Sequence, residues 1–61
     1  MTNRELEVLV RLPTRMSNAA IAASLFVSVN TVKTHVQHIY QELDVTNRDD
    51  AAKRGQELGL V

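Results

Sequence analysis

The stretch from Ser17 to Leu43 reads SNAAIAASLFVSVNTVKTHVQHIYQEL and decides the fold. Apolar residues recur every three or four positions over residues 18–25 and again over residues 29–43, which predicts two helices with one side each to bury. Ser17 and Ser28 precede the two patterns, where a hydroxyl caps a helix. Two capped helices joined by a short turn predict a helix-turn-helix unit, which lays its second helix in the major groove of DNA.

The helix predicted over residues 29–43 has two different sides. At about 100° per residue, its apolar stripe holds Val32, Val36, Ile39, Tyr40 and Leu43. The opposite side holds Asn30, Lys33, Thr34, Gln37 and Gln41. No acidic residue occurs on this helix before Glu42, so the polar side is the candidate reading surface. The alternative is an ordinary solvated polar face.

A further helix is predicted upstream, over residues 3–12. Thr2 and Glu5 fit the capping-box pattern, and the apolar residues that follow at helical spacing are Leu6, Leu9 and Val10. Pro13 cannot continue a helix interior, so the first connection begins there.

A fourth helix is predicted over residues 48–58, with Asn47 as its N-cap and Gly59 as its C-cap. Asp44 stands where the preceding helix needs a left-handed residue to end. Four helices with short loops predict one all-α domain with a central helix-turn-helix, over residues 1–61.

Three side chains invite specific expectations. Phe26 is the only phenylalanine and is expected to fill the core. His35 borders the apolar stripe and is expected to be half-buried and bonded to a backbone group. Arg48 is expected to pair with Asp44 or Glu42.

Net charge is zero over the 61 residues, but the charges are unevenly distributed. Residues 8–41 hold no acid and contain Arg11, Arg15 and Lys33. This acid-free middle favours a nucleic-acid partner more than the total charge does, because phosphate neutralisation needs local cations.

The sequence disfavours several classes of protein. The chain has no cysteine, so it has neither a disulfide framework nor a thiolate metal site. No apolar run approaches the roughly 20 residues of a membrane span. No nucleophile constellation or glycine-rich phosphate loop is present. We expect a cytoplasmic protein that is not an enzyme, with no cofactor, no metal and no membrane partner.

Four segments agree in order and spacing with one known family: TNRELEVL, SNAAIAASLFVSVNTVKTHVQHIY, TNRDDA and ELGL. From Thr2 to Leu60 the chain resembles the LuxR-type (GerE-like) helix-turn-helix domain of bacterial transcription regulators. The resemblance implies sequence-specific binding of double-stranded DNA by a homodimer, with residues 29–43 in the major groove and residues 48–58 at the dimer contact. It also implies an upstream sensor or receiver domain, as in response regulators.

The resemblance also assigns residues. Base contacts fall at Lys33, Thr34 and Gln37. Backbone contacts fall at Asn30, Thr31, Lys33 and neighbouring polar groups, for which we take Ser28, His38 and Gln41. For His38 the alternative is an ordinary solvent-exposed residue. The dimer contact falls at Ala52, Gly55 and Gln56. For Gly55 the alternative is close packing against the helix over residues 3–12.

The sequence departs from the family pattern at Glu42 and Asp44, where a lysine and a glycine are common. An acid at this end of the helix removes a phosphate partner, so we expect weak binding by a single copy. The competing function is a protein-interaction module that docks on RNA polymerase or on a sensor domain.

Overall fold

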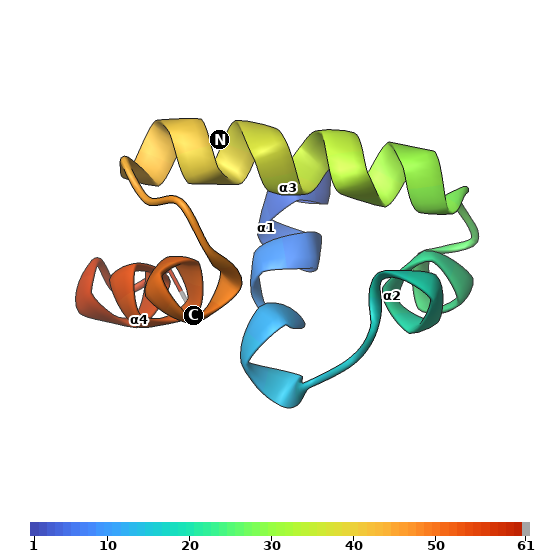
Figure 1. Cartoon of the computed structure of the whole chain (residues 1–61), viewed down its shortest axis with the longest axis horizontal. Coiled ribbons are helices and arrows are strands. Elements are labelled where there is room, and N and C mark those ends of the chain that lie inside the picture. Colours follow the sequence, from blue (N-terminus) through green and yellow to red (C-terminus); the bar gives the residue numbers. More distant parts are fainter. Residues whose placement is uncertain (61) are drawn as a thin grey trace.

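The computed structural model describes residues 1–60, and these form four α-helices and one 3-10 turn (Figure 1). The elements are α1 Asn3–Leu9, η1 Leu12–Thr14, α2 Asn18–Leu25, α3 Val29–Leu43 and α4 Arg48–Glu57. The longest helix, α3, runs along one edge of the molecule, and α1, α2 and α4 all lie on the same side of it (Figure 1). The predicted all-α, four-helix class is confirmed.

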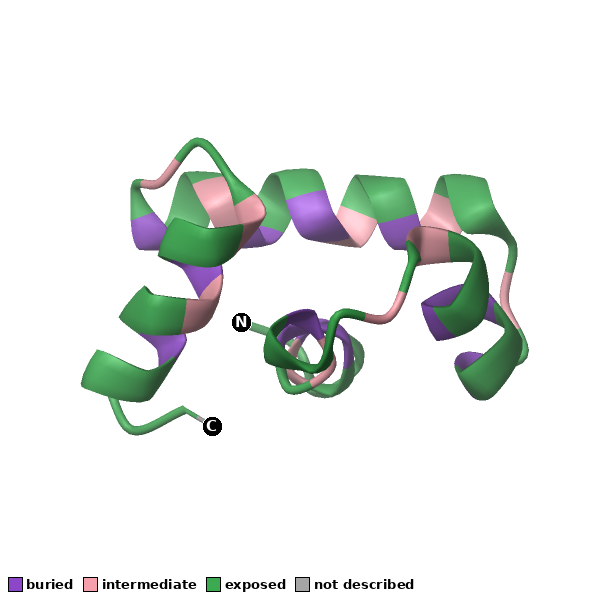
Figure 2. Cartoon of the chain, turned by 60° about the horizontal axis from the view of Figure 1, so that its bottom comes forward, coloured by how far each residue is buried: buried purple, intermediate pink, exposed green. Residues whose placement is uncertain are grey.

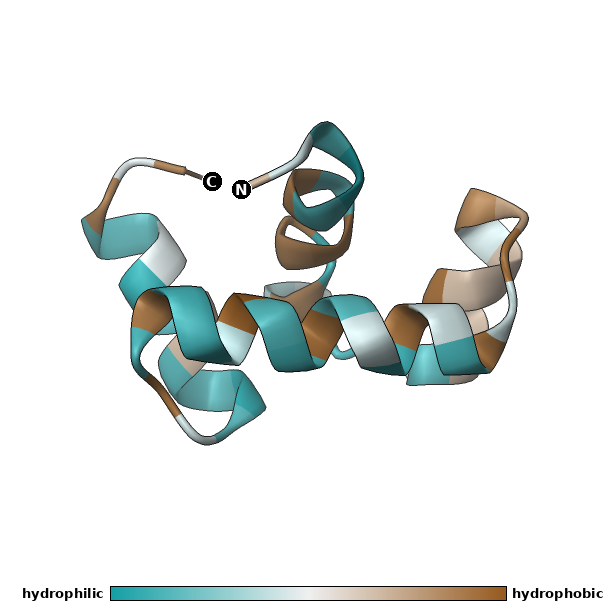
Figure 3. Cartoon of the chain, turned by 90° about the horizontal axis from the view of Figure 1, so that it is seen from above, coloured by the Kyte–Doolittle hydropathy of each residue, from teal (hydrophilic) through white to brown (hydrophobic). Residues whose placement is uncertain are grey.

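The core lies between α3 and the other three helices (Figure 2). From α3 it receives Val32, Val36, Ile39 and Leu43, while Tyr40 is half-buried. The other helices and η1 supply Val8, Leu9, Leu12, Ile21, Ala22, Leu25 and Ala51. Each large side chain fully removed from water contributes about 1.5–3 kcal/mol. The opposite side of α3 carries most of its polar residues (Figure 3).

Helix α1 begins as predicted but ends early. Its capping box is complete: the Glu5 amide donates to the Thr2 hydroxyl at 3.2 Å, and the Thr2 amide donates to the Glu5 carboxylate at 3.0 Å. The predicted end at residue 12 is wrong, because the α-helix stops at Leu9 and the chain tightens into η1. Pro13 lacks an amide hydrogen and its ring would clash with the carbonyl four residues earlier.

The buried side of α1 also differs from the prediction. Val10 is 42% exposed, whereas Glu5 is buried in line with Val8, Leu9 and Leu12. These four positions follow the three-and-four spacing of one helical face. Glu5 joins this face because its carboxylate is bonded within the capping box, which lowers the cost of burying it.

Helices α2, α3 and α4 end in the same way, on residues with left-handed backbone: Phe26, Asp44 and Gly59. In each case the amide of the residue that follows donates to the carbonyl five residues before it, at 2.9–3.0 Å. This is the Schellman arrangement, which satisfies carbonyls at a helix end. The caps predicted at Ser17, Ser28 and Asn47 are confirmed.

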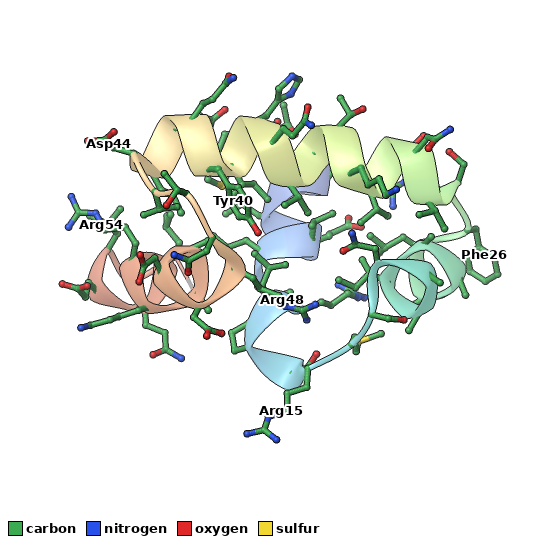
Figure 4. All side chains as sticks on the ribbon, viewed as in Figure 1. Arg15, Phe26, Tyr40, Asp44, Arg48 and Arg54 are labelled. Carbon is green, nitrogen blue, oxygen red and sulfur yellow. The ribbon has the colours of Figure 1, made fainter. Side chains whose placement is uncertain are left out.

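The prediction that Phe26 fills the core is wrong. Its side chain is 95% exposed, and it projects from the end of the molecule where α2 turns into α3 (Figure 4). With φ of 59°, Phe26 occupies the left-handed position of the turn, and the apolar contact of this motif falls to the next residue. That residue, Val27, is packed against the core.

Two contacts fasten α4 to the first part of the chain. Arg48 donates from Nε to the Leu12 carbonyl at 2.8 Å and from Nη2 to the Arg11 carbonyl at 3.3 Å. The expected pairing of Arg48 with Asp44 or Glu42 is therefore wrong. The guanidinium instead satisfies carbonyls at the junction of α1 and η1, toward which it points (Figure 4).

The second contact is the close approach of α4 to α1 at Gly55, which is buried. A Cβ atom there would lie 3.2 Å from both δ carbons of Leu9. The structure thus favours the alternative interpretation of Gly55, packing against the first helix. Little surface is left to a partner subunit at this residue.

We predict that Phe26→Asn stabilises the chain by about 0.5–1 kcal/mol. Asparagine adopts the left-handed conformation more readily than a bulky residue does, and an exposed ring loses no packing. Phe26→Ala is the matched control, since it removes the ring but keeps a Cβ in the same backbone conformation. Urea denaturation of the three proteins measures the effect. Equal stability of the two variants would show that backbone strain at Phe26 is absent.

Candidate nucleic-acid interface

The outer side of α3 is uncovered by other described elements. Asn30, Lys33, Thr34, Gln37, His38 and Gln41 are all exposed, and Thr31 is half-buried. The structure therefore places the predicted base-contact and backbone-contact residues on one connected surface, with Ser28 at its N-terminal end.

The N-terminal turn of α3 is held by hydroxyl groups. The Thr31 amide donates to the Ser28 hydroxyl at 3.1 Å, and the hydroxyls of these two residues lie 2.9 Å apart. The first-turn amides of a helix form a favourable seat for an anion. At this end of α3, a phosphate would meet two neutral hydroxyls and the positive end of the helix dipole.

One turn further along, Thr34 has its hydroxyl engaged. It donates to the Asn30 carbonyl at 3.0 Å. Because the hydroxyl is already bonded, the methyl group is the part of Thr34 best suited to contact a base. A threonine methyl packs on the C5-methyl group of thymine.

The cations of the acid-free middle do not gather on α3. Arg11 donates to the Ser24 hydroxyl at 3.1 Å and to the Glu7 carbonyl at 2.7 Å. Arg15 projects from η1 on the side opposite α3 (Figure 4). Of the three cations in residues 8–41, only Lys33 lies on the outer side of α3. The excess of positive charge in this segment therefore contributes less to the interface than the sequence indicates.

His38 is exposed but has a protein partner. Its Nδ1 atom lies 3.3 Å from Oε2 of Glu5, although the two residues are 33 positions apart. The backbone hydrogen bond from Thr2 lowers the pKa of Glu5, and the nearby His38 and His35 rings lower it further, while burial acts in the opposite direction. Sequence reasoning did not pair Glu5 with α3. The only signal was its place on the buried side of α1.

His35 is half-buried, as expected, but its Nδ1 atom is buried and has no hydrogen-bond partner among the described residues. The expected bond to a backbone group is therefore wrong.

The exposed polar side of α3, set on a capped helix-turn-helix, defines the class: this is a helix-turn-helix DNA-binding domain. A family model described as bacterial regulatory proteins of the luxR family (GerE) matches residues 1–54. The chain belongs to this family, and its general function is DNA binding in transcription regulation.

A solved structure supports the same assignment. The crystal structure of the response regulator ChrA of a heme-sensing two-component system is similar to 98% of this chain, with a TM-score of 0.95 and 43% sequence identity. This chain spans 30% of the length of that protein. Among the described residues, no helix is long and apolar enough to cross a membrane.

The lowered pKa of Glu5 makes stability depend on pH. Because the native pKa lies below the value of about 4.3 in unfolded chains, the stabilisation from Glu5 is complete above that value. It is lost as the pH falls through the lowered native pKa. We therefore expect Glu5→Gln to reduce the loss of stability on acidification, since glutamine preserves the capping box without a titrating group.

Urea denaturation from neutral pH to about pH 3, below the glutamate range, measures this effect. Glu7→Gln is the control, because it removes an exposed carboxylate of the same helix. If the stability of Glu5→Gln and Glu7→Gln depends on pH as that of the unaltered chain does, Glu5 does not contribute to the pH dependence of stability.

Proposed function

We propose that this chain binds double-stranded DNA sequence-specifically, with α3 lying in the major groove. The observation that carries the proposal is the uncovered outer side of α3, which holds polar side chains from Asn30 to Gln41 and no acid. An α-helix with its side chains is about as wide as the major groove. The outer side of α3 therefore has the size and the chemistry to contact base edges.

We assign the central residues of this side to the bases. Lys33 donates to acceptors on a guanine edge, Gln37 pairs with adenine through its amide, and the Thr34 methyl packs on thymine. Each bidentate contact contributes about 1–3 kcal/mol of discrimination against the wrong base. The backbone contacts are assigned to Ser28, Asn30, Thr31, Lys33, His38 and Gln41.

We further propose that two copies bind together through α4. With Lys33 as the one lysine on the outer side of α3, a single copy neutralises few phosphates, and each neutralised phosphate adds only modestly to affinity. Ala52 is half-buried and Gln56 is exposed one turn later, so both are accessible to a partner. The longest dimension of the domain is 28 Å, within the roughly 34–36 Å between half-sites one helical turn apart.

The similarity to a response regulator supports a longer parent protein with an upstream receiver domain. In that arrangement the receiver sets how readily two copies meet, and the present chain supplies the contact with DNA. Regulation then acts on the number of copies at the site, and base recognition stays on α3.

The assignment of α3 is tested by NMR titration with a duplex selected from a random pool for binding to this chain. We expect the largest amide shifts from Asn30 to Gln41, because these groups become buried against DNA. Shifts confined to α1 and α4 would overturn the assignment and favour a protein-docking role for α3.

Lys33→Ala is expected to weaken binding to the selected duplex and to lower the slope of log affinity against log salt by about one unit. Lys53→Ala is the control, since Lys53 is an exposed lysine on α4. Titrations at several salt concentrations measure both slopes. If Lys33→Ala leaves the salt slope unchanged and relaxes sequence preference at one base pair, Lys33 contacts a base and does not contact the backbone.

A further inference from the structure

His38 bridges α1 and the outer side of α3. Its side chain is 54% exposed, yet Nδ1 lies 3.3 Å from the carboxylate of Glu5, whose own side chain is only 6% exposed. One edge of the ring therefore faces a covered carboxylate, while about half of the His38 side chain remains exposed to solvent. This arrangement is unlike that of a freely rotating surface histidine.

Glu5 cannot easily move away from His38. The carboxylate accepts the Thr2 amide at 3.0 Å, and the Glu5 amide donates to the Thr2 hydroxyl at 3.2 Å. The capping box thus fixes the group that faces Nδ1. Since the two ring nitrogens point in diverging directions, holding Nδ1 toward α1 turns Nε2 away from α1. The hydrogen-bond partner of one ring nitrogen decides whether the other nitrogen is a donor or an acceptor.

The charged and titratable groups around the ring come from two elements. From α1 there is Glu5, and from α3 there are His35 and Glu42, one turn to either side. The side chain of Glu42 is 40% exposed, whereas that of Glu5 is 6% exposed. Glu5, the acid that faces Nδ1 of His38, is therefore covered by protein. A phosphate that approaches Nε2 from the solvent side does not meet the Glu5 carboxylate directly.

The chemistry of imidazole decides which protonation state of His38 can bind a phosphate. A neutral ring with its proton on Nδ1, toward Glu5, has only an acceptor at Nε2, which a phosphate cannot use. The protonated ring donates from both nitrogens, so it can bind Glu5 and a phosphate oxygen together. Phosphate binding in this geometry therefore requires that His38 be charged.

We propose that His38 is a proton-dependent ligand for a DNA phosphate and that Glu5 is its positioning residue. The capping box of α1 then takes part in DNA binding without touching DNA, and affinity rises as the pH falls. This inference rests on the proposed binding of DNA through α3.

The test is a double-mutant cycle with Glu5→Gln, His38→Gln and the double variant, on a duplex selected from a random pool with this chain. Affinities are measured at about pH 6 and about pH 8, within and above the range in which histidine commonly changes charge. We expect the unaltered chain to bind about threefold more tightly at the lower pH, the size of an exposed ion pair. His38→Gln should abolish this difference, and at the lower pH it should reduce the salt slope by up to about one unit.

Glu5→Gln should also shrink the pH effect, and the double variant should bind no more weakly than His38→Gln alone, because Glu5 acts through His38. Additive losses would overturn the positioning role of Glu5. A pH effect that survives His38→Gln would overturn the role of His38.

Lys33→Ala separates this inference from the proposed function. It should weaken binding at both pH values and leave the pH effect intact. If Lys33→Ala weakens binding while His38→Gln changes nothing, the proposed interface stands and the present inference fails. If neither substitution changes binding to the selected duplex, both fail.

Discussion

The apolar stripe of α3 is the interaction on which the rest of the structure depends. α1, α2 and α4 all pack on this stripe, and α2 makes its main packing contact there. A domain of about this size buries only about 60% of the surface of its unfolded chain, so it has no second core to compensate. Because α3 serves as the common support, its outer side is left uncovered. The packing that holds the domain together therefore also creates the uncovered polar surface that we propose for DNA.

Features that depend on neighbouring residues could be predicted from the sequence. The caps at Thr2, Ser17, Ser28 and Asn47 each involve a side chain and an amide three residues later, and the stripe of α3 depends only on helical periodicity. The outer side of α3 followed directly from that periodicity. The family to which the chain belongs was likewise evident from four segments of the sequence.

Features that join distant parts of the chain could not be predicted. Arg48 bonds carbonyls 36 and 37 positions away, and periodicity gives no information about such partners. The contact of His38 with Glu5 has the same origin. The prediction that Phe26 fills the core failed for a different reason. Hydrophobicity favours burial, but the left-handed position that ends α2 directs the side chain into solvent. Backbone geometry outweighs hydrophobicity there, because the turn between α2 and α3 fixes the orientation of the two helices.

The exposure of the outer residues of α3 also bears on how such domains diversify. Lys33, Thr34 and Gln37 face solvent and take no part in the core, and substitutions at positions of this kind usually change stability by no more than about 0.5 kcal/mol. In the binding mode that we propose, recognition can therefore change by exchange of a few outer residues while the inner stripe keeps the fold constant. One fold can in this way give rise to many regulators with different target sequences, because its core does not have to change.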